Sequence, residues 1–129
     1  MISFEAFRQT DGTPIYLQII RYIQQGLAAG TIRDGDELPS RRVVSALLAV
    51  NPNTVQKAFR LLEDEGLVVS RAGAKSYVQA SPQQIAALRR VLLETEMQAM
   101  VDAAKRIGLT REEAHRLLDT LYDKEGTDA

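Results

Sequence analysis

The chain has 129 residues, 45% hydrophobic and 26% charged, with no cysteine and a formal net charge of −1. These values are typical of a globular protein, and the lack of cysteine excludes disulfides, zinc–cysteine sites and thiol catalysis. No apolar run approaches the roughly 18–20 residues needed to cross a bilayer, and the first five residues lack the basic stretch and apolar segment of a secretory signal. We therefore expect a cytoplasmic protein without membrane association.

A first helix is predicted between Thr13-Pro14 and Gly30. Thr13 offers a hydroxyl cap, and Pro14 suits the first helical position, where no amide hydrogen bond is lost. Gly30 suits the left-handed conformation that closes a helix, and the segment 34–36 after it predicts a turn. Apolar residues at three- and four-residue spacings form one stripe of this helix: Tyr16, Ile19, Ile20, Ile23 and Leu27.

Two further helices are predicted in quick succession. Ser40 suits the cap of a short second helix, and the apolar members of this helix are Val43, Val44, Leu47 and Leu48. Asn51-Pro52 opens the third helix, again as a cap followed by proline, and Gly66 ends it. Its buried side is expected to hold Val55, Ala58, Phe59 and Leu62, with Leu61 near the edge. Its outward side then carries Asn53, Gln56, Lys57 and Arg60.

Two short β-prone segments follow, at 67–69 and 77–78. They flank a hairpin-length loop at 71–75 that contains Gly73. Helix, short helix, turn, helix and hairpin is the order of a winged helix-turn-helix domain. The sequence therefore predicts a mainly α fold with a small β hairpin, and it places this domain in residues 1–80.

Residues 81–129 predict two amphipathic helices. Ser81 with Gln84 and Thr110 with Glu113 match capping boxes, and Gly108 stands between the two helices. Two such helices cannot hide their apolar faces by themselves, so they pack either on the first domain or on another chain. We favour a second copy of this chain. The residues expected to form the dimer contact are Leu88, Leu92, Met97, Met100, Val101, Leu117, Leu118 and Leu121.

Basic side chains concentrate in the middle of the chain. Residues 38–62 contain four basic side chains and no acidic ones, whereas residues 81–129 contain seven basic and nine acidic ones. A helix fits the DNA major groove, where Asn and Gln can pair with base edges and Lys and Arg reach phosphate or guanine. The candidate DNA-binding residues are Ser40, Arg41, Arg42, Asn51, Asn53, Thr54, Gln56, Lys57 and Arg60, with Arg71, Gly73 and Lys75 from the hairpin loop. For any one position the alternative is an ordinary polar surface, and for Gly73 it is the turn itself.

Catalytic, cofactor and metal sites have no signature in the sequence. His115 is the only histidine and has no cysteine beside it, and the acids at 34–37 lack the twelve-residue calcium pattern. The glycines form no phosphate-cradling motif. We expect neither an enzyme nor a cofactor, and no small-molecule effector is identified. Met97 and Met100 could line an effector site, but core packing suits them better.

Two other classes of function stay open beside DNA binding. A winged-helix scaffold can serve as a protein-interaction module, which would show no salt-dependent shift of operator DNA. A structural adaptor built on the tail helices would make residues 1–80 dispensable.

Ordered motifs run through residues 12–79. They are Pro14-Ile15-Tyr16-Leu17-Gln18-Ile19, Gly30-Thr31-Ile32, Gly35-Asp36-Glu37-Leu38-Pro39-Ser40-Arg41-Arg42, Val50-Asn51-Pro52-Asn53-Thr54-Val55-Gln56-Lys57-Ala58-Phe59, Leu62-Glu63 and Glu65-Gly66-Leu67-Val68. Together they closely resemble the amino-terminal domain of GntR-family transcription regulators. The brief two-helix tail is similar to that of the YtrA subfamily, whose members lack a large effector-binding domain.

The resemblance implies a homodimeric repressor that binds an inverted-repeat DNA operator, with the tail helices forming the dimer contact. It implies that Arg42 touches the DNA backbone or a base, and that the polar residues from Asn51 to Lys57 begin the recognition helix. Pro52 stands where many relatives outside this subfamily carry a base-reading arginine. Lys75 replaces the second glycine of the usual wing pattern, so we expect a different turn and an added phosphate contact. By analogy with the subfamily, the regulated genes include a neighbouring membrane-transporter operon and the regulator's own gene.

Overall fold

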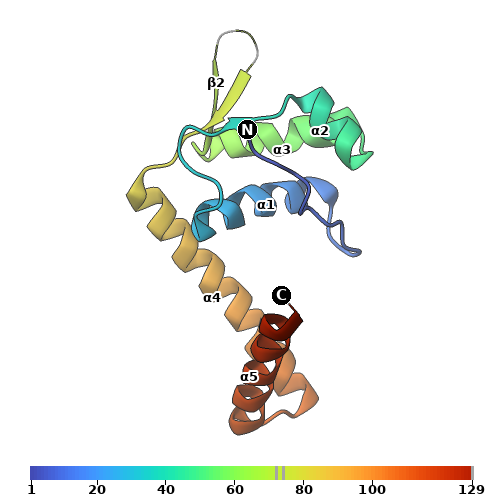
Figure 1. Ribbon diagram of the computed structural model, residues 1–129, viewed down its shortest axis with the longest axis vertical. Coiled ribbons are helices and arrows are strands. Elements are labelled where there is room, and N and C mark those ends of the chain that lie inside the picture. Colours follow the sequence, from blue (N-terminus) through green and yellow to red (C-terminus); the bar gives the residue numbers. More distant parts are fainter. Residues whose placement is uncertain (72, 74, 129) are drawn as a thin grey trace. The chain divides into compact units, whose positions relative to one another are not determined.

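The computed structural model describes residues 1–71, 73 and 75–128, with residues 125–128 described by their backbone alone. The elements follow in the order α1 (Ile15–Ala29), β1 (Glu37–Leu38), α2 (Arg41–Leu48), α3 (Pro52–Asp64), β2 (Val68–Arg71), β3 (Lys75–Val78), α4 (Pro82–Ile107) and α5 (Arg111–Asp128) (Figure 1). The predicted mainly helical fold with a small sheet is confirmed. The chain divides into two compact units, Met1–Arg90 and Val91–Ala129.

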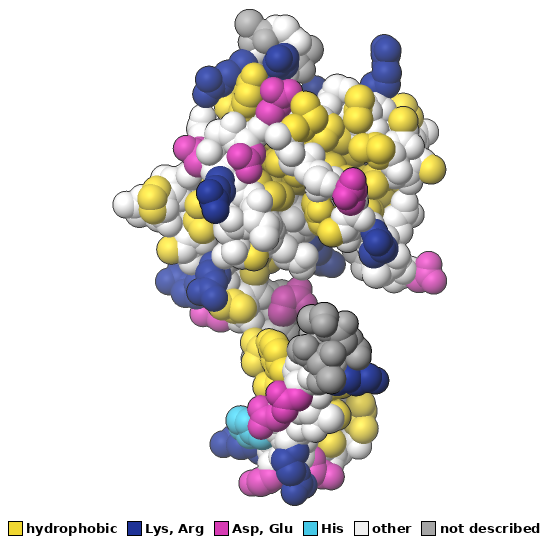
Figure 2. Space-filling model, in the orientation of Figure 1, with side chains coloured by type: hydrophobic (Ala, Val, Ile, Leu, Met, Phe, Trp, Pro, Cys, Tyr) yellow, Lys and Arg dark blue, Asp and Glu magenta, His cyan; other side chains and the backbone are white. Residues whose placement is uncertain are grey.

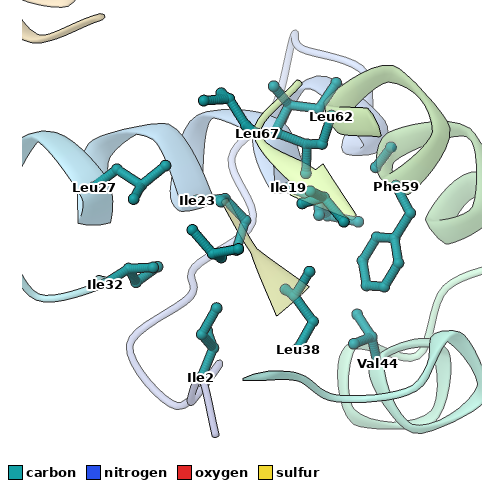
Figure 3. Close-up of a cluster of buried hydrophobic side chains, with 14 of the residues drawn as sticks. Ile2, Ile19, Ile23, Leu27, Ile32, Leu38, Val44, Phe59, Leu62 and Leu67 are labelled. Carbon is teal, nitrogen blue, oxygen red and sulfur yellow. The ribbon is translucent and has the colours of Figure 1, made fainter. Parts of the chain in front are cut away.

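The hydrophobic core of the first unit gathers side chains from α1, α2, α3 and the sheet. Figure 3 shows these side chains converging from elements that are far apart in the sequence. Ile19 and Ile23 of α1 meet Phe59 and Leu62 of α3, and all four are completely buried. Every fully buried apolar side chain among the described residues lies between Ile2 and Ala80.

Most of the predicted helix ends are confirmed by hydrogen bonds. The Ser40 hydroxyl oxygen accepts from the Val43 backbone amide at 3.1 Å, and the Asn51 carboxamide oxygen accepts from the Asn53 amide at 2.8 Å. Gly30 closes α1 in the left-handed conformation, with φ 85°. The start of α1 was predicted wrongly in one detail. Pro14 itself is the cap residue, and no side chain caps this helix.

The capping boxes of α4 and α5 also form as predicted. Ser81 and Gln84 exchange hydrogen bonds of 3.1 and 2.8 Å, and Thr110 and Glu113 exchange bonds of 3.1 and 3.0 Å. The hydrogen bonds that the Glu113 carboxylate accepts from the backbone and side chain of Thr110 hold the pKa of Glu113 below its ordinary value. Both helices therefore begin at sites that the sequence specifies locally.

The four apolar side chains of α2 divide between the core and the surface. Val44 is fully buried and Leu48 is half-buried, but Val43 is 46% exposed and Leu47 is 64% exposed. A helix of eight residues touches the core along a single stripe, and the stripe used is Val44 with its i+4 neighbour Leu48. The adjacent stripe, Val43 and Leu47, is left in solvent.

The sheet is larger than the predicted hairpin. Its strand order is β1-β3-β2, with every pair antiparallel, so β3 is the central strand. Strand β1, whose Leu38 pairs with Ser76, was not predicted. Arg71 and Lys75, predicted in the loop, are strand residues paired directly across β2 and β3. Gly73 between them has φ 81°, and Ala72 and Ala74 of the predicted loop lie outside the described residues.

The amino-terminal segment also contributes to the core, which the sequence analysis missed. Ile2, Phe4 and Phe7 are buried, and the Phe4 ring stacks on the ring of Tyr22 in α1 with centroids 5.1 Å apart. The Ile2 backbone amide donates to the Glu37 carbonyl at 2.8 Å, so this segment continues to the edge strand of the sheet.

The second unit buries far fewer side chains than the first. No residue of α4 is fully buried, and Gly108, with φ 85°, ends this helix before α5 begins. Ile85 and Leu88 in the first turns of α4 pack against the core of the first unit, so Leu88 does not belong to a free tail surface. The first compact unit therefore includes the first turns of α4 and extends to Arg90. None of the described helices combines the length and hydropathy that a membrane span requires.

Candidate nucleic-acid interface

One side of α3 is exposed and carries polar and basic groups. Asn53, Gln56, Lys57 and Arg60 are all exposed, and their spacing of three, four and seven residues places them on one face of the helix. The opposite side holds Val55, Ala58, Phe59 and Leu62, all buried as predicted. From Pro52 to Arg60 no acidic residue interrupts the exposed face.

The polar residues at the start of α3 divide between structural and free groups. The Asn51 side-chain oxygen is engaged as the helix cap, which leaves its amide nitrogen to solvent. Thr54 is half-buried, and its backbone amide donates to the Asn51 carbonyl at 2.9 Å. Ser40, at the start of α2, is likewise exposed with its hydroxyl oxygen accepting from Val43. The side-chain oxygens of Ser40 and Asn51 thus cap the two helices. The Ser40 hydroxyl hydrogen and the Asn51 amide nitrogen can still donate to a ligand.

The two adjacent arginines of α2 have different surroundings. Arg42 is exposed. The Arg41 guanidinium, by contrast, forms an ion pair with Glu63 at 3.1 Å and lies over the Phe59 ring, 5.3 Å from its centroid. The Ser70 hydroxyl of β2 donates to the same Glu63 oxygen at 3.0 Å. Arg41 thus faces the protein, where it connects α2 with α3, and Arg42 is the arginine available to a ligand.

Lys57 also has a neighbour that the sequence did not suggest. Its ammonium nitrogen lies 4.0 Å from the centroid of the Tyr16 ring, in the first turn of α1. Tyr16 was assigned to the buried stripe of α1, but it is half-buried and packs at the edge of the core. Glu63, Ser70 and Tyr16 are therefore the residues of this surface that sequence reasoning missed. Lys57 and Arg41 contact residues of other elements, Tyr16 and Glu63, and Ser70 of β2 contacts Glu63 across the turn after α3. Helical periodicity alone could not have found these contacts.

The hairpin adds basic groups to the same unit. Arg71 and Lys75 are exposed and directly opposite each other across β2 and β3. The Arg71 guanidinium also lies over the Tyr77 ring, 5.2 Å from the centroid. Two like charges in such a pair destabilise a hairpin, so an anion between them would relieve a repulsion that the free protein carries.

Together these elements present neutral hydrogen-bonding groups and cations but few acids. The exposed cations are Arg42, Lys57, Arg60, Arg71 and Lys75. Figure 2 shows dark blue side chains projecting from the part of the first unit that carries the hairpin and α2. Within the described residues, no three His, Cys, Asp or Glu side chains lie close enough to hold a metal ion. The chemistry available is therefore polyanion binding, with amides and hydroxyls that can read base edges.

Comparison with known proteins identifies the family. Residues 15–78 match the family described as "Bacterial regulatory proteins, gntR family". The chain is 30% identical to the HTH-type transcriptional repressor YtrA of Bacillus subtilis over 104 residues, which cover 80% of each chain. It belongs to the GntR family of bacterial transcription regulators.

Solved structures of GntR-family regulators share its fold. A GntR family transcriptional regulator from Listeria monocytogenes superposes with a TM-score of 0.75 at 27% identity, covering 87% of this chain and 98% of that one. YtrA from Sulfolobus acidocaldarius gives a TM-score of 0.56 at 32% identity, covering 77% and 99%. The chain is thus a YtrA-like, DNA-binding transcription regulator with a winged-helix fold. Because the GntR family consists of such regulators, the expectation that the chain is not an enzyme is confirmed.

Proposed function

We propose that this GntR regulator is a cytoplasmic homodimeric repressor that inserts α3 into the major groove at each half of an inverted-repeat operator. The observation that carries the proposal is the exposed face of α3, which holds Asn53, Gln56, Lys57 and Arg60 without an acidic residue. Asn and Gln suit adenine edges, while Lys and Arg suit guanine or phosphate. Helix-turn-helix dimers read half-sites about one helical turn apart, roughly 34–36 Å.

Arg42 and the hairpin extend the proposed contact to the DNA backbone. Arg42 is exposed at the start of α2, and Arg71 and Lys75 are exposed at the turn end of the hairpin. Each phosphate neutralised by such a cation releases a counterion, so affinity should fall steeply as salt rises. A protein-interaction module would lack this dependence.

Exposed apolar side chains of α4 and α5 support the proposal that these two helices bind a second copy of the chain. Met97 and Leu117 are each 48% exposed and Leu121 is 51% exposed, while no described side chain beyond Ala80 is fully buried. A tail of this kind gains little hydrophobic stabilisation within one chain. Homodimerisation through Leu92, Met97, Met100, Val101, Leu117, Leu118 and Leu121 would cover these groups, and the two-fold symmetry would match an inverted repeat.

Replacing Lys57 tests the DNA-binding face. The operator is first selected from a random-sequence duplex library by the wild-type chain, and we expect an inverted repeat. Lys57→Glu should abolish the gel shift of this duplex and leave the dimer intact. Arg89→Glu, at an exposed position of α4 away from α3, is the control because it changes the net charge equally. Normal affinity of Lys57→Glu would remove α3 from the proposal.

A second variant tests the dimer. Leu117→Asp should convert the dimer to a monomer in sedimentation experiments and weaken operator binding, because the tail would no longer join two α3 helices. His115→Asp adds the same charge on nearly the opposite side of α5, about 160° from Leu117, and should leave the dimer unchanged. A Leu117→Asp chain that stays dimeric would place the dimer contact elsewhere.

Footprinting of DNA upstream of the regulator's own gene and of neighbouring transporter genes tests the proposed targets. Protection at an inverted repeat there would support autoregulation. Selective binding to unrelated promoters would contradict it.

A further inference from the structure

The Lys57 ammonium lies over the face of the Tyr16 ring, 4.0 Å from its centroid. This is a favourable cation–π distance. Tyr16 is half-buried and packs against the core, so its ring is fixed, whereas Lys57 is exposed on α3. No carboxylate of a described side chain lies within 4.0 Å of this ammonium. The ring of Tyr16 is therefore what restrains the Lys57 side chain in the free protein.

The Tyr16 ring places the Lys57 ammonium on one particular side of α3. Tyr16 belongs to α1, which packs along α3, so the ring draws the Lys57 ammonium to the flank of α3 that faces α1. When a helix lies in the major groove, its flanks run beside the phosphates of the two strands and its centre faces the bases. A lysine held at the flank is placed for a phosphate and not for a base edge.

The contact with the ring is compatible with a phosphate contact. A lysine ammonium has three N–H donors, so one side can face the ring while another donates to a phosphate oxygen. Lysine loses considerable rotamer freedom when it binds, and a side chain already confined by the ring loses less of it on DNA binding.

We infer that Tyr16 is a positioning residue of the DNA-binding face, whose ring holds the Lys57 ammonium at the flank of α3 for a DNA phosphate. This inference rests on the proposed insertion of α3 into the major groove. In this arrangement α1 contributes to DNA binding indirectly. Its Tyr16 positions Lys57 of α3, and Lys57 contacts the DNA.

A double-mutant cycle separates positioning from a general structural role. Tyr16→Leu should weaken binding of the selected operator duplex about two- to five-fold when Lys57 is present. In the Lys57→Met background the same change should have no further effect. Tyr16→Phe should bind like the wild type, because the ring is retained. Tyr22→Leu, which removes a ring from the aromatic cluster around Phe4, is the control for structural damage and should act equally in both backgrounds.

Proton NMR of the free dimer tests the contact without DNA. The ε-methylene protons of Lys57 should be shifted upfield by the ring current in the wild type and in Tyr16→Phe, and should return to ordinary positions in Tyr16→Leu. An absent upfield shift, or equal losses of affinity for Tyr16→Leu in both Lys57 backgrounds, would overturn the inference alone. A wild-type chain that selects no DNA from the library would overturn the proposed function, and this inference with it.

Discussion

Arg41 and Glu63 connect the start of α2 to the end of α3 through an ion pair of 3.1 Å. The same carboxylate oxygen accepts a hydrogen bond from Ser70 at 3.0 Å, which brings β2 of the wing into the contact. Glu63 therefore fixes three elements of the DNA-binding domain relative to one another. Glu63 is thus the residue at which α2, α3 and β2 meet.

Glu63→Gln should destabilise the first unit. The two side chains are 31% and 33% exposed, so water screens the pair and its loss should cost about 1 kcal/mol, well below the cost of breaking a buried pair. This corresponds to a lowering of Tm by about 4–8 °C for a domain of this size, measured by circular dichroism. Asp64→Asn, at the neighbouring exposed position, should leave the Tm nearly unchanged. Equal melting of the two variants would mean that the pair contributes nothing.

The two arginines of α2 should differ in operator binding. Arg42→Gln removes an exposed cation from each protomer and should weaken binding and lower the salt slope by about 0.9 for each lost phosphate contact. Arg41→Gln should lower the Tm but change the salt slope little, because the Arg41 guanidinium faces Glu63 and Phe59. Fluorescence anisotropy titrations across a range of salt concentrations measure both slopes. A larger change of slope for Arg41→Gln would assign the phosphate contact to Arg41 instead.

Local signals in the sequence account for what was predicted correctly. Ser40, Asn51 with Pro52, and Gly30 act within a few residues of a helix end, so the chain alone specifies them. The polar face of α3 follows from helical periodicity in the same way. Each of these features can be predicted from the sequence without knowing what the helix packs against.

Tertiary pairing accounts for what was missed. The two residues of β1 are extended because they pair with β3, about forty positions later, and Ile2 is buried because the first residues fold back on the core. In α2, Val43 and Val44 are both apolar, and only the packing of α2 decides which of them faces inward. The partners of Arg41 and Lys57 likewise come from distant elements.

Replacing Ala49 by glycine should stabilise the domain. Ala49 ends α2 in the left-handed conformation, with φ 54° and ψ 47°, which strains a residue that has a Cβ. Glycine accepts this conformation without steric cost, so Ala49→Gly should raise the free energy of unfolding by about 0.5–1 kcal/mol. Ala46→Gly in the interior of the same helix should lower it by about 1 kcal/mol. Urea denaturation measures both changes, and a destabilising Ala49→Gly would show that the turn between α2 and α3 is unstrained.

In the hairpin of β2 and β3, a substitution that raises the stability of the domain should lower its affinity for DNA. Arg71 and Lys75 are directly opposed at the turn end of the hairpin, so Lys75→Glu replaces a repulsion with an attraction and should stabilise the free domain by about 0.2–1 kcal/mol. The same change removes a cation from the proposed DNA surface and adds an anion, which should weaken operator binding and reduce its salt slope. Lys75→Gln removes only the repulsion and should fall between the wild type and Lys75→Glu in both measurements. If Lys75→Glu binds the operator with unchanged affinity and salt slope, the wing does not approach the DNA backbone.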